Sequence, residues 1–78
     1  MFKVKLDIGN IKVFVNEVTK LDSDVSLVSG RYKIDAKSIM GIFSLDLSKP
    51  VDVVFEKGAI EDECETLYNR LKELNIAI

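Results

Sequence analysis

The sequence predicts an α+β fold, an open-faced two-layer sandwich in which three helices cover one face of a four-stranded sheet. Apolar residues alternate with polar ones over short stretches that are typical of half-buried strands. Over other stretches they recur every three or four residues, as in amphipathic helices. The resulting order is β-α-β-β-α-β-α, and a chain of 78 residues has the size of one domain, here residues 1–78. Such short strands cannot bury themselves, so the helices must cover the sheet.

The first strand and the first helix lie on either side of Gly9-Asn10. Residues 2–8 alternate apolar and polar side chains, which predicts a half-buried strand. Gly9 interrupts this pattern, and Asn10 is a good helix N-cap. A short amphipathic helix to about Lys20 is predicted by apolar residues at helical spacing: Ile11, Phe14, Val15, Val18 and Leu21.

A hairpin and a second helix are predicted in the middle of the chain. Ser29-Gly30 is a tight-turn signal, so we expect residues 24–29 to pair with residues 31–36. Ser38 is placed to cap a short helix that reaches Leu45, because a serine hydroxyl can accept a hydrogen bond from the first helical turn.

The fourth strand and the last helix complete the pattern. Residues 51–56 alternate as a strand that ends at Lys57-Gly58. Acidic residues crowd the first turns of the last helix and basic residues lie later, which suits the helix dipole. We expect Cys64 to be a small buried apolar residue. The helix carries one apolar stripe: Ile60, Cys64, Leu67, Leu71, Leu74 and Ile78.

Composition argues against several classes of function. The net charge is −2 and charges of both signs are interspersed without a basic stripe, so we expect no nucleic-acid binding. No apolar run approaches the roughly 20 residues of a membrane span, and residues 1–6 alternate where a signal peptide would be continuously apolar. A single cysteine cannot form an internal disulfide, so we expect a cytoplasmic location. The acidic residues lack the spacing of a calcium loop, so no metal or other cofactor is expected.

The segment from Lys37 to Leu45 reads KSIMGIFSL and resembles the most recognisable stretch of HPr, the small phosphocarrier of the bacterial sugar phosphotransferase system. The turn at residues 20–25 and the acidic start of the last helix from Gly58 resemble HPr through their spacing. The resemblance covers nearly the whole chain. It implies that the four strands form one antiparallel sheet with all three helices on one side.

The chain departs from this family at the phosphorylation loop. After its first strand an HPr has a Gly-x-His-Ala-Arg-Pro-Ala pattern, in which the histidine takes the phosphate and the arginine and the helix start hold it. Here a shortened loop runs from Asp7 to Lys12, and the chain contains no histidine. Neither Asn10 nor Lys12 can relay a phosphoryl group as an imidazole does. We therefore expect neither phosphocarrier nor enzyme activity, and we assign no catalytic residue.

The resemblance implies a regulatory role for Ser38 and a docking role for the helix that follows it. Ser38 matches the serine that a dedicated kinase phosphorylates in HPr relatives of Gram-positive bacteria, a role compatible with N-capping. Ile39, Met40 and Phe43 match the side of this helix on which HPr-like folds bind partners, and Lys37 adds charge beside it. The alternative is that every apolar side chain of this short helix is buried in the core.

Two functions remain open at this point. The first is a regulatory module controlled through Ser38 and linked to sugar phosphotransferase or catabolite regulation. Its partners would be an HPr kinase/phosphorylase and a transcription regulator or metabolic enzyme. The second is a diverged HPr-like binding domain that is never phosphorylated. Incubation with HPr kinase and ATP followed by mass measurement distinguishes the two.

Overall fold

The computed structural model describes residues 2–57 and 60–78. Within these residues the four strands form one antiparallel sheet in the order β1-β4-β2-β3. The predicted order of elements and the antiparallel sheet are therefore confirmed. The elements are β1 (Phe2–Val4), α1 (Ile11–Thr19), β2 (Asp24–Ser29), β3 (Tyr32–Asp35), α2 (Ile39–Phe43), β4 (Val51–Lys57) and α3 (Ile60–Glu73).

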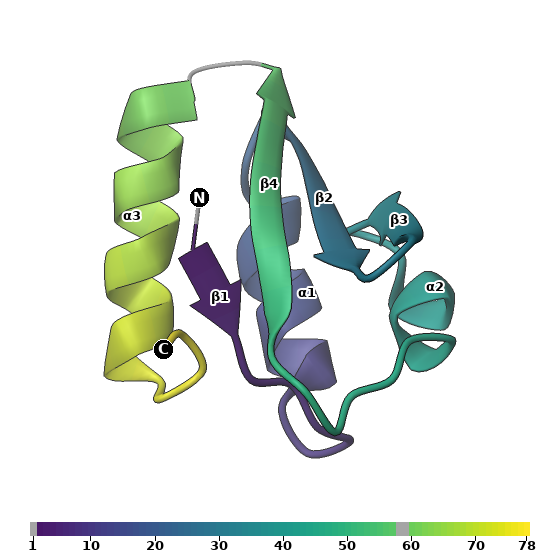
Figure 1. Ribbon diagram of the computed structural model, residues 1–78. Coiled ribbons are helices and arrows are strands. Elements are labelled where there is room, and N and C mark those ends of the chain that lie inside the picture. The colour runs from purple at the N-terminus through teal and green to yellow at the C-terminus, as the bar shows by residue number, and fades with distance from the viewer. Residues whose placement is uncertain (1, 58–59) are drawn as a thin grey trace.

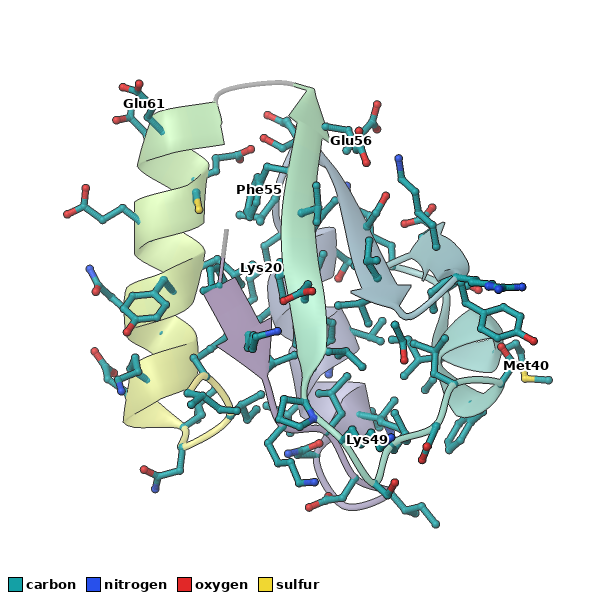
Figure 2. All side chains as sticks on the ribbon, viewed as in Figure 1. Lys20, Met40, Lys49, Phe55, Glu56 and Glu61 are labelled. Atoms are coloured by element: carbon teal, nitrogen blue, oxygen red, sulfur yellow. The ribbon has the colours of Figure 1, made fainter. Side chains whose placement is uncertain are left out.

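The helices lie on one side of the sheet, as predicted. Figure 1 shows α1 behind the sheet, with α3 beside β1 and α2 beside β3 at its two edges. The opposite face, turned toward the viewer, carries charged side chains such as Glu56 (Figure 2). Lys3 on β1 pairs there with Asp52 on β4 at 2.8 Å, an exposed ion pair of the kind that adds little stability. The protein is thus an open-faced two-layer sandwich.

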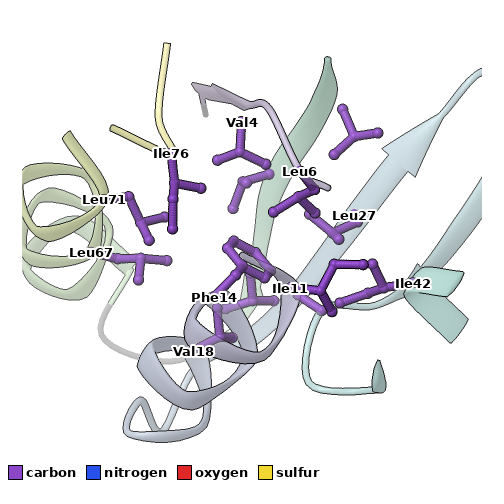
Figure 3. Close-up of a cluster of buried hydrophobic side chains, with 14 of the residues drawn as sticks. Val4, Leu6, Ile11, Phe14, Val18, Leu27, Ile42, Leu67, Leu71 and Ile76 are labelled. Carbon is purple, nitrogen blue, oxygen red and sulfur yellow. The ribbon is translucent and has the colours of Figure 1, made fainter. Parts of the chain in front are cut away.

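The hydrophobic core fills the space between the helices and the inner face of the sheet. Phe14 from α1 lies in its middle and is 0% exposed (Figure 3). Val51 and Val53 alternate inward from β4, while Leu67 and Leu71 reach the core from α3. The predicted burial of Leu67 and Leu71 is therefore confirmed.

The predicted hairpin is also confirmed. β2 pairs with β3 from Ser26 opposite Asp35 to Ser29 opposite Tyr32. Gly30 has a φ of 59°, a left-handed conformation that glycine adopts without a steric penalty. The Ser29-Gly30 signal in the sequence therefore marks the turn through the backbone freedom of Gly30.

The first strand is shorter than predicted, and Asn10 does not cap α1 as expected. β1 ends at Val4, and no side-chain cap bond from Asn10 reaches the helix. The Asn10 side chain bonds instead to residues that precede it. Its Oδ1 accepts a hydrogen bond from the Asp7 N–H at 2.8 Å, and its Nδ2 donates one to the Lys5 carbonyl at 3.0 Å. Asp7 Oδ1 accepts in return from the Asn10 N–H at 2.9 Å. This reciprocal pattern is a capping box, so Asp7 caps the turn that leads into α1.

The last helix also ends earlier than its apolar stripe predicted. α3 ends at Glu73, and Asn75 has a φ of 60°. Asparagine tolerates this left-handed conformation, which commonly terminates helices. The stripe continued to Ile78 in the sequence, but the prediction that Ile78 lies on the core face of the helix was wrong.

The residues after α3 turn back along β1. The Lys5 N–H donates to the Ile76 carbonyl at 2.8 Å, and the Ile78 N–H donates to the Lys3 carbonyl at 3.0 Å. Ala77 forms an isolated bridge with β1. As a result Ile76 is buried, whereas Ile78 is 58% exposed. These residues cover part of the sheet edge that β1 would otherwise leave bare.

Cys64 is half-buried, not buried in the core as predicted. It lies beside Phe2, where β1 begins, and together with Tyr68 it lines a surface groove. The core stripe of α3 is therefore carried by Leu67 and Leu71. The expectations for Gly58 and for the side chain of Ile60 lie outside the described residues.

A tether from α3 holds the turn between α1 and β2. The Glu63 carboxylate accepts hydrogen bonds from the Asp22 N–H at 3.1 Å, from the Ser23 N–H at 2.9 Å and from the Ser23 hydroxyl. Ser23 is 0% exposed, so its polar atoms depend on this partner. The hydrogen bond from the Ser23 hydroxyl, followed by those from the backbone and the charge of Lys37, lowers the pKa of Glu63.

We expect Glu63 to make the protein acid-sensitive. A carboxyl group whose pKa is lower in the folded state contributes stability above its unfolded pKa, usually about 4.5, and this contribution is lost as the pH falls through the folded pKa. Glu63→Gln should therefore be less stable at neutral pH, and its unfolding free energy should fall less in acid. Denaturant unfolding between about pH 3 and pH 7 measures both. Parallel pH profiles for the two proteins would contradict the prediction, and Glu65→Gln serves as an exposed control.

Candidate functional site

The candidate site consists of α2 and the serine that precedes it. Ser38 has extended backbone angles, with φ −99° and ψ 101°, and its Oγ accepts a hydrogen bond from the Gly41 N–H at 3.2 Å. The predicted N-cap role is therefore confirmed. Ser38 is half-buried, and the hydrogen bond that its hydroxyl accepts is partly buried.

Gly41 makes room for this hydroxyl. A Cβ at Gly41 would lie 3.2 Å from Ser38 Oγ, which is closer than most real contacts of that kind, and 3.4 Å from Ile34 Cδ1, at the lower limit of ordinary van der Waals contact. The serine hydroxyl and the side chain from β3 can both approach the helix because Gly41 has no side chain. The sequence interpretation did not single out Gly41, although an isolated glycine inside a short helix is a signal of close approach.

The outer side of α2 is apolar. Met40 is 77% exposed, Phe43 is 50% exposed and Ile39 is 37% exposed, and Figure 2 shows Met40 pointing away from the protein. We call these three residues the α2 surface. Ile42 and Leu45 supply the inner side and are buried. The alternative in which all five side chains are buried is therefore wrong, while the docking role of the α2 surface stays a prediction.

The α2 surface continues into a shallow groove beside the loop that follows β1. This groove has a volume of about 560 Å³ and is lined by residues 6–9 on one side and by Phe43, Leu45 and Leu47 on the other. Ile8 is 83% exposed there, because it lies in the turn closed by the hydrogen bond between Asp7 and Asn10. The alternating pattern of residues 2–8 had predicted that Ile8 belongs to the first strand. Sequence reasoning missed Ile8, since its apolar side chain fitted the predicted strand.

Lys37 does not lie on the α2 surface. Its Nζ donates to the Leu21 carbonyl at 2.8 Å, on the turn after α1, and its charge acts on Glu63. Its backbone N–H donates to Asp35 Oδ1 at 2.9 Å. The structure thus brings Ser38 together with the α2 surface and directs the Lys37 ammonium toward the tether at Glu63. A partner-binding role for Lys37 stays a prediction.

The loop after β1 carries a carboxylate at the start of the turn that leads into α1. Asp7 occupies this position through its bond with the Asn10 N–H. A negative charge near the start of a helix is stabilising, and Asp7 supplies one there.

Within residues 2–57 and 60–78, no cluster of three or more histidine, cysteine or acidic side chains is arranged to hold a metal ion. Among the helices described, none combines the length and the apolar character of a membrane span.

Similar solved structures cover nearly the whole chain. One is the HPr-C-His structure from Thermoanaerobacter tengcongensis, which is 32% identical, with 95% of this chain and 84% of that chain covered and a TM-score of 0.74. Another is Crh, a catabolite repression protein of Bacillus subtilis, which is 30% identical, with 91% and 84% covered and a TM-score of 0.69. The Crh structure is described as an intertwined dimer with a swapped domain.

A third similar structure is an HPr dimer from Thermoanaerobacter tengcongensis, which is 30% identical, with 88% of this chain and 80% of that chain covered and a TM-score of 0.68. The comparison with curated proteins returns no match. The family model described as the PTS HPr component phosphorylation site matches residues 3–74. The four-stranded antiparallel sheet with its three helices agrees with these relatives. The chain therefore belongs to the HPr family.

Proposed function

We propose that this protein is a non-catalytic, cytoplasmic regulatory module that signals through phosphorylation of Ser38 in sugar phosphotransferase or catabolite regulation. One observation carries the proposal: a capping serine lies directly beside an exposed apolar surface in a chain that has no histidine. The chain keeps a serine at a helix start and an exposed apolar surface beside it, the two features on which the proposed phosphoserine switch depends. It lacks the imidazole that a phosphate relay in this family needs.

Phosphorylation would place a strong charge next to an apolar surface. A phosphoserine carries about −1.5 to −2 charges near neutral pH and three acceptor oxygens. At Ser38 these oxygens would meet the N–H groups at the start of α2, among them that of Gly41, so the fold can remain intact. A partner with basic residues beside an apolar pocket would then distinguish the modified protein from the unmodified one, because only the modified protein offers both features.

Two kinds of partner fit this switch. An HPr kinase/phosphorylase would add and remove the phosphate, and a transcription regulator or metabolic enzyme would bind the α2 surface. The resemblance of residues 37–45 to HPr supports the first partner. The likeness to a protein of catabolite repression supports the second. Methionine and phenylalanine suit this role, since both make adaptable apolar contacts.

We expect HPr kinase and ATP to add a single phosphoryl group to the intact protein. Mass spectrometry detects the addition, and peptide mapping should locate it at Ser38. Ser38→Ala should remain unmodified under the same conditions. Because that substitution also removes a cap worth about 1 kcal/mol, its unfolding curve must show that it is still folded. Modification of Ser38→Ala, or no modification of the wild type, would overturn the proposal.

A second candidate is a binding domain that uses the same surface without phosphorylation. The observation that favours it is the exposed Ile8, which extends the α2 surface into the groove beside Phe43 without any added charge. In that case the kinase would leave the protein unmodified. Phe43→Ser would weaken partner binding equally in the wild type and in Ser38→Ala. Such a pair of results would replace the first candidate with this one.

A further inference from the structure

A second apolar groove lies at the opposite edge of the sheet from α2. It runs between α3 and β1, which Figure 1 shows on the far side of β4 from α2. Its volume is about 680 Å³. We call it the α3 groove. One wall is formed by Phe2, Lys3 and Ile78, and the other by Glu61, Cys64, Glu65 and Tyr68.

The wall on α3 is one continuous helix face, separate from the face that enters the core. Residues 61, 64, 65 and 68 stand at positions i, i+3, i+4 and i+7, which lie together on a helix surface. Across the groove, the Phe2 ring meets the Tyr68 ring edge to face, with centroids 5.1 Å apart. This contact ties the two walls together, so the apolar lining around Cys64 is preformed.

The charges around the α3 groove are unevenly distributed. Glu61 and Glu65 are exposed at the end where α3 begins, and Figure 2 shows Glu61 projecting from that end. Among the ion pairs of the described residues, none includes either carboxylate. Lys3 is already paired with Asp52 at 2.8 Å. The groove therefore offers apolar walls beside uncompensated negative charge.

We propose that the α3 groove binds a short basic, apolar segment of a partner protein. An apolar side chain would lie against Phe2, Cys64 and Tyr68, while a lysine or arginine next to it would meet Glu61 and Glu65. Charge complementarity selects this occupant. Nucleic acids and anionic membranes would be repelled by the two carboxylates. A symmetric contact with a second copy would bring the carboxylates of both copies into one interface, where they repel each other.

This inference goes beyond the proposed function, because the α3 groove and the α2 surface lie at opposite edges of the sheet. A protein with both surfaces can hold one partner at each edge. Binding at the α3 groove requires no phosphate on Ser38. Failure of one proposal therefore leaves the other untouched, and Ser38→Ala should bind in the groove as the wild type does.

The chain's single cysteine provides a direct reporter, because Cys64 lies in the groove wall. The probe is a short blocked peptide with a central phenylalanine flanked by leucines and lysines. Its control has the same sequence with glutamate in place of each lysine. We expect the lysine peptide to slow the reaction of Cys64 with a maleimide in a saturable manner. The glutamate peptide should leave the reaction rate unchanged.

Matched variants test the electrostatic part of the proposal. The double substitution Glu61→Gln/Glu65→Gln should weaken binding of the lysine peptide about three- to tenfold, the effect of losing two exposed charge pairs. The control Asp62→Asn/Glu73→Gln changes the net charge equally on the same helix outside the groove, and should bind within about twofold of the wild type. All four side chains lie outside the apolar core, so both variants should fold.

Three results would overturn the proposal. In the first, the lysine peptide does not protect Cys64. In the second, both double variants lose affinity equally, which would mean that only the net charge matters. In the third, Cys64 becomes protected as the protein concentration rises without peptide, and sedimentation shows a dimer. That result would make a second copy the occupant of the groove.

Discussion

Replacing Leu71 with alanine is expected to lower the free energy of unfolding by about 2–4 kcal/mol. Leu71 is 0% exposed and joins Leu67 in docking α3 against the core. The substitution removes buried apolar surface and leaves a cavity that the surrounding side chains fill only partly. Urea denaturation at neutral pH measures the change, provided that the slope of the transition stays the same.

Two neighbouring substitutions serve as controls for this prediction. Leu74 is only half-buried, so Leu74→Ala should cost less than Leu71→Ala. Ile78 is 58% exposed, so Ile78→Ala should change the stability by no more than about 0.5 kcal/mol. If Leu71→Ala also costs less than about 0.5 kcal/mol, then α3 is not docked through this side chain.

The second large effect concerns phosphate transfer. We expect the protein to accept no phosphoryl group from enzyme I and phosphoenolpyruvate, because the chain contains no histidine. Asp7 and Asn10 are hydrogen-bonded to each other in the loop after β1, and neither side chain is a nucleophilic imidazole. The protein would therefore be inactive as a carrier, not merely slower than a histidine-containing HPr.

Phosphoprotein that is stable in base and labile in acid is the product to look for, since a phosphohistidine has that stability. An HPr with its histidine, incubated in the same mixture, shows that enzyme I is active. Acid-labile phosphate on the present protein would contradict the prediction, and with it the correspondence between residues 7–12 and the phosphorylation loop. Phosphate on Ser38 is stable in acid and would not be mistaken for it.

Periodicity was sufficient to predict the elements whose structure is decided locally. The spacing of Ile11, Phe14 and Val18 predicted α1, and all three side chains are buried. Gly30 marked the β2–β3 turn, and Ser38 marked the start of α2. In each case the residues that determine the structure are neighbours in the sequence. The same holds for the α2 surface, where one short helix carries all three exposed side chains.

The features that sequence reasoning missed depend on which partner a side chain or strand takes, whether that partner is near or far along the chain. The alternation of residues 2–8 could not show that Asp7 and Asn10 would end it. The stripe of α3 reaches Ile78 by spacing alone, while the chain leaves the helix to pair with β1. Lys37 stands next to Ser38 in the sequence, yet its ammonium contacts the Leu21 carbonyl. Only the folded chain shows which of several possible partners a side chain takes.

The position of β1 in the sheet has a consequence for synthesis of the protein. Its neighbours are β4 on one side and residues 76–78 on the other, although β1 is synthesised before both of them. Val4 and Leu6, both buried in the finished fold, cannot reach their native surroundings until residues 51–53 have been made. Long chain segments must then close against their entropy before these contacts form. A partly folded chain that lacks β4 therefore exposes the apolar side of β1, and an unpaired apolar strand of this kind makes folding intermediates prone to aggregate.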